Sequence, residues 1–286
     1  FRGKHMNITV WGCRGTLPTP GQNSLKYGGH TTCLEIRNKA GFVTIVDAGS
    51  GLRNLGKKLL QENGSNELCL ILTHSHWDHL MGFPFFLPAY FSRFKINVCG
   101  IQSARNYMCQ ALARQLEAPY FPVDFEQLKA QFNFGCSGPG CGSCMHMQVE
   151  TIQLSHPNGG FGFKFTEAGR QFVFLTDNEL GHRHPGGLLP YEYCDFAKGA
   201  DLLFHDAQYT DAEYEKTKTW GHSTYNQVLK LAMDAKVKRL GLFHHDPDRT
   251  DAELDQIVAE LRQKAAAAGS NLDIFAVFEG MQIELE

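Results

Sequence analysis

The densest group of chemically active side chains in the sequence lies between His74 and His79. Three imidazoles and one carboxylate occur within these six residues, in the order His74, His76, Asp78 and His79. Imidazole nitrogens and carboxylate oxygens are common ligands of zinc and of other borderline divalent metals. Four such groups in one turn can contribute ligands to two neighbouring ions. We therefore predict a metal centre at this loop, in preference to a polar loop that is rich in histidine by chance.

An apolar run, 68–72, comes directly before this motif and predicts a short buried strand. The end of that strand would place the four ligands in the turn that follows. Three further predicted strands also end in metal-competent side chains, which are His156 after 149–154, Asp177 after 171–175, and His244 with His245 after 240–243. One such residue alone is often a cap or a turn residue. Because the carboxyl ends of strands carry the chemistry of α/β proteins, four of them together indicate a shared site.

The hydrophobic pattern indicates a single α/β domain over residues 7–286. Strands and helices alternate in both halves of the chain, and no linker or low-complexity tract divides them. Two sheets between outer helices would bury such apolar strands on both faces, so we expect an αββα four-layer sandwich. Helices are predicted at 52–62, 103–116, 125–131, 224–235 and 251–268, and the last strand at 274–278. Residues 1–6 are interpreted as a remnant of cloning, which excludes His5 from the chemistry.

The composition favours a soluble, cytoplasmic, globular protein. The 286 residues carry a formal net charge of -3 and no long basic run, which argues against a tight grip on duplex nucleic acid. The sequence has no apolar stretch of membrane-spanning length and no signal sequence at its start. Its nine cysteines are an odd number and fall mostly on predicted strands. Reduced thiols explain that pattern better than a disulfide framework does.

The segment Thr73–His79, together with His156, Asp177 and a late histidine, resembles the metallo-β-lactamase superfamily from Asn7 onward. The resemblance implies an αββα sandwich and a binuclear centre, with zinc as the expected ion and manganese or iron as alternatives. It also implies seven ligands: His74, His76 and His156 for one ion, Asp78, His79 and the late histidine for the other, and Asp177 as the bridge.

Two histidines compete for the position of the late ligand. Strand alternation would place Leu240, Leu242 and His244 on one face, and Phe243 and His245 on the other. We therefore favour His244, with His245 as the alternative.

The bridging position narrows the expected activity. True β-lactamases of this superfamily usually carry cysteine where this chain has Asp177. The stretches 11–16, 28–33 and 221–224 are closer to the phosphodiesterase branch, which includes the transfer-RNA 3′-endonuclease, the carbon–phosphorus lyase-associated phosphodiesterase and cyclic-nucleotide phosphodiesterases. We therefore expect hydrolysis of a small nucleotide-like or cyclic-nucleotide phosphodiester by a hydroxide that bridges two metal ions. A lactone or thioester hydrolase, with Tyr209 or Tyr225 near the metals, is the alternative, and a non-catalytic ligand-binding module is a more distant one.

Two residues are expected to act on the reacting groups. Asp78 would help to orient the nucleophile, and His222 would protonate the leaving alkoxide, as it resembles the proton-donating histidine of the endonuclease branch. The alternative for the His222 segment is a helix start capped by Ser223 or Thr224. Asp206 is expected to orient a metal-binding histidine or to cap a turn. Further candidates for phosphate contacts are His30, Arg14, His182 and His184, and the alternative for each is a solvated loop group.

The partner is expected to be a small phosphodiester substrate, without a membrane and without a stable nucleic-acid complex. An aromatic stretch, Phe83–Phe91, follows the metal loop. It would serve core packing or a homodimer surface, or else form a wall on which a nucleotide base stacks.

A glycine-rich insert near 135–147 raises a second metal question. It carries three thiols and one imidazole within eleven residues, which are Cys136, Cys141, Cys144 and His146. Four such ligands would suit a structural zinc ion apart from the catalytic pair. The alternative is a flexible loop whose thiols are incidental.

Overall fold

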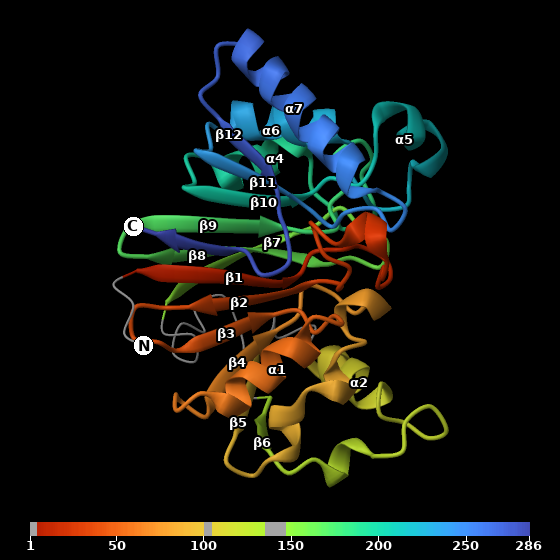
Figure 1. Cartoon of the computed structure of the whole chain (residues 1–286), viewed down its shortest axis with the longest axis vertical. Helices are drawn as coiled ribbons and strands as arrows, with labels where there is room; N and C mark the ends of the chain where they lie inside the picture. Colours follow the sequence, from red (N-terminus) through yellow and green to blue (C-terminus); the bar gives the residue numbers. More distant parts are fainter. Residues whose placement is uncertain (1–4, 100–104, 135–146) are drawn as a thin grey trace. The chain divides into compact units, whose positions relative to one another are not determined.

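The computed structural model describes residues 5–99, 105–134 and 147–286 (Figure 1). The chain forms two compact units. The first unit comprises Phe1–Gly12, His30–Val149 and Gly280–Glu286, and the second comprises Cys13–Gly29 and Glu150–Glu279. Each unit contains one β-sheet with its own helices, so the predicted α/β class is confirmed. The organisation as one domain stays a prediction.

The first unit is built on a seven-stranded sheet. In spatial order its strands are β13 (Gln282–Leu285), β1 (Met6–Gly12), β2 (Cys33–Arg37), β3 (Val43–Val46), β4 (Glu67–Ile71), β5 (Lys95–Cys99) and β6 (Gln131–Asn133). The pairs from β13 to β3 are antiparallel, and those from β3 to β6 are parallel. Because β3 and β4 are parallel neighbours, Asp47 after β3 and the Thr73–His79 loop after β4 meet at one edge.

Helix α1 (Leu52–Gln61) packs on β1 and on two short 3-10 turns, Phe83–Phe85 and Leu87–Tyr90. Helix α2 (Arg105–Arg114) lies within the helix predicted at 103–116.

The helix predicted at 125–131 is wrong. A single 3-10 turn, Phe125–Gln127, is followed directly by β6, in which Phe132 pairs with Ile96 of β5. The rings of Phe125 and Phe132 pack with their centroids 4.9 Å apart. Strand pairing and ring packing therefore override the local helical pattern.

The second unit is built on a six-stranded sheet. In spatial order its strands are β12 (Asp273–Ala276), β11 (Arg239–Phe243), β10 (Leu202–Asp206), β9 (Arg170–Leu175), β8 (Phe161–Glu167) and β7 (Gln148–Gln153). Strands β9 to β12 are parallel, and β8 is antiparallel to β9. The carboxyl ends of β9, β10 and β11 therefore reach the same edge of the sheet. Asp177, Asp206 and His244 lie at those three ends.

The helices of the second unit are α4 (Pro190–Ala197), α5 (Asp211–Thr217), α6 (Tyr225–Asp234) and α7 (Asp251–Ala267). Apolar residues of α4, α6 and α7 form one buried core with Val173, Leu203 and Leu242 of the sheet. Thr224 caps α6 by accepting a hydrogen bond from the backbone N–H of Gln227. This cap fixes where α6 begins and so holds the preceding residue pair, His222 and Ser223, at the sheet edge.

Three elements escape the sequence pattern. Helix α4 starts at a proline, α5 is short and has no fully buried residue, and neither shows a long apolar periodicity. The strand predicted to be the last is followed by β13, whose partner β1 lies at the other end of the sequence. Within the described residues, no helix has the length and the apolar character that crossing a membrane requires.

Candidate metal centre

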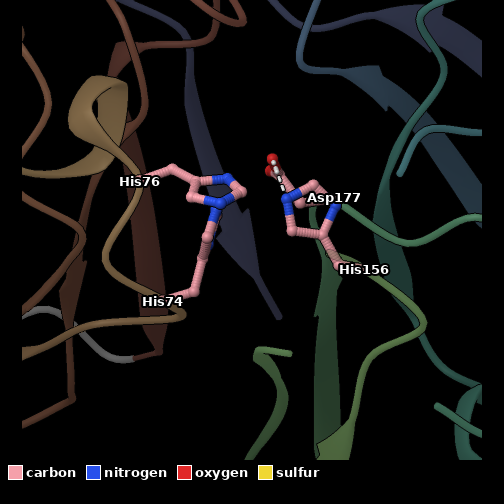
Figure 2. A group of neighbouring side chains, drawn as sticks. All are labelled: His74, His76, His156 and Asp177. Carbon is pink, nitrogen blue, oxygen red and sulfur yellow. Dashed lines mark ion pairs between the residues drawn. The ribbon is translucent and has the colours of Figure 1, made fainter. Parts of the chain in front are cut away.

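The first ligand cluster consists of His74, His76, Asp78 and His79, all in the loop that follows β4. Ring centroids lie 4.6 Å apart for His74 and His76, and 4.2 Å apart for His74 and His79. His79 Nε2 lies 3.4 Å from Asp78 Oδ2. Figure 2 shows the imidazoles of His74 and His76 side by side. The structure thus brings together all four predicted ligands of this loop.

Asp47 supports the first ligand cluster from the end of β3. His79 Nδ1 donates a hydrogen bond of 2.8 Å to Asp47 Oδ2, and the Thr73 amide and hydroxyl donate to the two carboxylate oxygens at 2.7 Å each. Since that hydroxyl donates to Asp47, it accepts from His74 Nδ1 at 3.1 Å. Burial raises the pKa of Asp47, while the charge and hydrogen bond of His79 and the hydrogen bonds of Thr73 oppose the rise. With each Nδ1 held in this way, Nε2 is the ring atom that would bind a metal.

The second ligand cluster consists of His156, Asp177 and His244, which come from three loops of the second unit. His156 Nε2 lies 3.5 Å from Asp177 Oδ2, and His244 Nε2 lies 3.3 Å from Asp177 Oδ1. The first of these contacts is the dashed line in Figure 2. All three side chains are at most 2% exposed. The structure therefore brings together these predicted ligands of the second unit.

The hydrogen bonds of the two histidines in the second ligand cluster orient their rings for a bound cation. His156 Nδ1 donates to the Gly221 carbonyl at 2.9 Å, and His244 Nδ1 donates to Gln208 Oε1 at 3.1 Å. Each ring therefore directs its Nε2 toward an oxygen of the Asp177 carboxylate. Imidazole nitrogens and carboxylate oxygens that converge in this way are atoms that a divalent cation binds together. The donor set therefore fits a divalent metal.

The backbone at both clusters adopts conformations that few residues tolerate. Asp47, Asp177 and His244 have φ angles of 62°, 53° and 57°, in the left-handed region. Two glycines make room for ligand rings. A Cβ on Gly15 would lie 2.4 Å from His244 Nδ1, and a Cβ on Gly221 would lie 2.1 Å from His156 Nδ1. Such strain is typical of sites where packing holds a side chain in one position.

His244 and His245 face different environments. His245 is fully buried, and its Nε2 donates a hydrogen bond of 2.8 Å to the Val277 carbonyl. Burial lowers the pKa of His245 to about 3, so this ring stays neutral. The argument from strand alternation that favoured His244 is wrong, because β11 ends at Phe243 and the backbone turns at His244. This turn, rather than the alternation, directs His244 to Asp177.

His222 lies beside the second ligand cluster. Its ring stacks on that of His244 with centroids 4.9 Å apart, and its Nδ1 donates to Asp206 Oδ2 at 3.3 Å. Donor atoms of Asp177, His222 and His244 all lie within 4.8 Å of one another. Burial alone would raise the pKa of Asp206, but His205 and His222 outweigh it, and the pKa lies below its ordinary value. Asp206 is therefore an ionised partner that fixes the Nδ1 proton of His222.

Arg14 does not face a phosphate, contrary to the prediction. It is fully buried, and its guanidinium donates to the backbone carbonyls of Gly28, Asp246 and Arg249. These bonds tie the segment between β1 and β2 to the loop between β11 and α7, which is a structural role.

The other candidate histidines also have protein partners. His30 contacts Ser50 Oγ at 3.0 Å and Asn54 Nδ2 at 3.1 Å. His184 Nε2 contacts Glu179 at 2.7 Å, while the ring of the partly exposed His182 packs edge-on against that of His184.

The aromatic stretch after the metal loop divides between core and surface. Phe83 and Phe86 are buried, which agrees with core packing and leaves no free face on which a base could stack. Phe85 and Phe91 are about half exposed. The predicted ligands of the insert, Cys136, Cys141, Cys144 and His146, lie outside the described residues.

Four residues with roles at these clusters were not predicted from the sequence. Asp47 and Gln208 hold ligand histidines, Trp77 is 69% exposed within the ligand motif, and Glu179 receives several hydrogen bonds near His156. The position of Asp47 at a strand end was a usable signal. The contacts of Gln208 and Glu179 depend on distant parts of the chain and left no local signal.

Comparison with known proteins agrees with this architecture. The chain matches the family described as the β-lactamase superfamily domain over residues 44–245, more than half of its length. It is 23% identical to ribonuclease Z of Staphylococcus carnosus, over 91% of this chain and 94% of that protein. Among solved structures, the metallo-β-lactamase fold protein YhfI from Bacillus subtilis aligns with a TM-score of 0.66, at 16% identity over 98% and 100% of the two chains. The short form of human tRNase Z aligns with a TM-score of 0.63, at 20% identity over 98% and 99%.

The chain belongs to the β-lactamase superfamily domain family, and it has the metallo-β-lactamase fold that the sequence predicted. Together with the clusters of imidazoles and carboxylates, this membership identifies it as a metal-dependent hydrolase of the phosphodiesterase type.

Proposed function

We propose that this protein hydrolyses small nucleotide-like phosphodiesters with two divalent metal ions, zinc in the first instance. The two ligand clusters would share the ions: His74, His76 and His156 for one, Asp78, His79 and His244 for the other, and Asp177 as the bridge. The observation that carries the proposal is the anchoring of ligand imidazoles through Nδ1. In both clusters a fixed Nδ1 hydrogen bond supports Nε2 as the atom that would bind the metal.

When bound, the ions would supply an activated water and positive charge for the phosphoryl oxygens. The chain's own residues would then complete the reaction. Asp78, beside His79, would accept a hydrogen bond from the attacking water and so orient it. His222 would protonate the leaving oxygen from Nε2, because Asp206 holds the proton on its Nδ1. The Asp206 carboxylate would also stabilise the imidazolium form that this step requires.

Trp77 favours a nucleotide over a simple alkyl diester. This residue lies between the ligands His76 and Asp78 and is 69% exposed. Its indole N–H donates a hydrogen bond of 3.0 Å to Gln115 Oε1, which fixes the ring orientation. A fixed, exposed aromatic face offers a base a stacking surface worth about 1–3 kcal/mol.

A second candidate is the processing of RNA 3′ ends. The likeness to ribonuclease Z over nearly the whole of both chains supports it. The net charge of -3 favours the smaller substrate, because a protein that grips many phosphates is usually basic.

The lactone hydrolase alternative depends on a tyrosine near the metals. Tyr225 is buried, and its hydroxyl donates to the Gln208 backbone carbonyl. Tyr209 packs edge-on against His222 with ring centroids 6.0 Å apart, which keeps a lactone among the substrates to be assayed.

Location in the cytoplasm and assembly into a homodimer stay proposals. Within the described residues six cysteines have reduced thiols, which suits a reducing compartment.

The test is a substrate comparison with the zinc-loaded protein. Bis(p-nitrophenyl) phosphate, a cyclic nucleotide, a transfer-RNA precursor with a 3′ trailer, a lactone and nitrocefin would be assayed side by side. The proposal expects cleavage of the two small diesters. Cleavage of the precursor alone would move the assignment to RNA processing, and opening of the lactone alone would contradict the phosphodiesterase assignment.

Substitution of Trp77 tests the nucleotide preference separately. Trp77→Ala is expected to raise KM for the cyclic nucleotide by about tenfold, the equivalent of about 1.4 kcal/mol of stacking. KM for methyl p-nitrophenyl phosphate, which has no base, serves as the internal control and should stay within about twofold. An equal change for both substrates would contradict the stacking role.

A further inference from the structure

Glu179 is a buried carboxylate that follows the ligand Asp177 by two positions. It is 1% exposed, and four donors surround it. Oε1 accepts from the Tyr214 hydroxyl at 2.6 Å and from the Thr219 amide at 2.8 Å. Oε2 accepts from the Gly221 amide at 2.8 Å and from His184 Nε2 at 2.7 Å. These bonds use the acceptor capacity of the two carboxylate oxygens, which is about four hydrogen bonds.

Two of the four donors, the Thr219 and Gly221 amides, belong to the segment that leads into His222, and the third, Tyr214, lies in the preceding helix α5. Thr219 and Gly221 in this segment have φ angles of 77° and 99°, in the left-handed region. A non-glycine residue such as Thr219 adopts this conformation only when its surroundings compensate for the strain. The two amide bonds to Glu179 provide that compensation.

The same segment contacts a ligand and the expected proton donor. The Gly221 carbonyl accepts a hydrogen bond from His156 Nδ1, and the Gly221 amide donates one to Glu179. Gly221 therefore links Glu179 to the His156 ring. His222 follows directly and reaches Asp206. One carboxylate thus fixes a loop that orients His156 on one side and His222 on the other.

We propose that Glu179 is a positioning residue for the metal ligand His156 and for the proton donor His222. The inference rests on the proposed function for the roles of these two histidines. Packing supports it independently, since a Cβ on Gly181 would lie 2.4 Å from the Tyr214 hydroxyl, so Tyr214 sits against the backbone beside Glu179. Glu179 acts only through the 219–222 loop and does not touch the reacting atoms.

The substitution Glu179→Gln tests this role with little change in volume. The amide NH₂ would replace one oxygen and face a backbone N–H, so the hydrogen bond from Thr219 or Gly221 would be lost, whereas the Tyr214 hydroxyl or the His184 ring can accept from the new NH₂. A displaced His222 would slow diesters with poor leaving groups, which need a proton, more than diesters with p-nitrophenolate, which do not. We expect the ratio of the rate for p-nitrophenyl diesters to the rate for diesters with poor leaving groups to rise by about tenfold or more. A displaced His156 would weaken zinc binding by about 10–100-fold.

Glu35→Gln is the matched control. Glu35 is a fully buried carboxylate of the first unit, paired with Arg37 and Lys58, and its change should leave the rate ratio as it is. Tyr214→Phe removes one of the four bonds and should give a smaller shift in the same direction. If Glu179→Gln does not fold, Glu179→Asp keeps the charge on a shorter side chain, and a partial effect is expected.

Zinc affinity, measured by competition with a chromophoric chelator, separates a failure of the proposed function from a failure of the positioning role of Glu179. A wild-type protein that cleaves no diester would remove the proposed function, and the zinc affinity of Glu179→Gln would still report on His156. Equal slowing of both substrate classes with unchanged zinc affinity would overturn the positioning role. A Glu179→Gln protein with wild-type rates and affinity would overturn it as well.

Discussion

The two ligand clusters differ in how the chain builds them. The first takes four side chains from one loop of six residues, with support from a single carboxylate, Asp47. The second takes three side chains from three loops, and each histidine has its own partner, Gly221 for His156 and Gln208 for His244. The first is local in sequence, whereas the second takes its residues from the ends of three different strands, β7, β9 and β11.

This difference has a physical consequence. Loss of a supporting group in the first ligand cluster affects histidines that are already close in sequence and held by one turn. In the second, the same loss frees a loop that has no neighbouring ligand to restrain it. We therefore expect the second ligand cluster to be the more sensitive to substitution.

The largest effect is expected for Asp177→Ala. Removing the proposed bridge should lower the metal content toward one ion per chain and reduce hydrolysis by at least about 10³-fold, because bound metal stabilises transition-state charge by several kcal/mol. Elemental analysis and the diester assay measure the two results. Asp201→Ala is the control, since Asp201 pairs with Arg170 and Lys238. A protein with Asp177→Ala that still holds two ions would exclude Asp177 as the bridge.

His222→Ala should have the next largest effect. Loss of the proton donor is expected to lower kcat for a cyclic nucleotide by about 10²–10⁴-fold. Metal content should remain that of the wild type, because His222 is not a proposed ligand. Elemental analysis of the purified variant checks this point, and loss of an ion would assign His222 to the ligands instead.

The smallest effects are expected for Asp47 and Gln208, the residues that support one ligand histidine in each cluster. Asp47→Asn replaces one of the two carboxylate oxygens that accept from His79 and Thr73, and Gln208→Ala removes the acceptor of His244 Nδ1; each should weaken zinc binding by about 10–100-fold. Because Asp47 is shared by His79 and Thr73 within one loop, we expect its variant to lie at the lower end of that range. Competition titrations with a chelator give both affinities. A far weaker affinity for Asp47→Asn than for Gln208→Ala would reverse the comparison.

The same difference explains how much could be predicted from the sequence. The first ligand cluster forms a motif of adjacent residues, so its chemistry could be inferred directly from their spacing. Candidates for the second could be found only because His156, Asp177 and His244 each follow a predicted strand. Gln208 and Gly221 hold the two histidines, and Glu179 holds Gly221. These contacts form only in the tertiary structure and left no periodic signal in the sequence.

The fold shows a similar limit. Buried parallel strands such as β4 and β9 are short apolar runs that sequence patterns detect well. The helix predicted at 125–131 was wrong because β6 gains its stability from pairing with β5 rather than from local propensity. Strand β13 pairs with β1 from the opposite end of the sequence, and its edge position gave no distinct local pattern.

The most direct test of the central claim, that the two ligand clusters together hold two catalytic ions, is a metal count tied to activity. Elemental analysis would be made on the protein in which Cys136, Cys141 and Cys144 are replaced by serine, so that zinc in the insert cannot contribute. Two ions per chain, with diester hydrolysis that a chelator abolishes and zinc restores, is the predicted result. Fewer than one ion per chain, or hydrolysis that persists after complete removal of metal, would contradict the account.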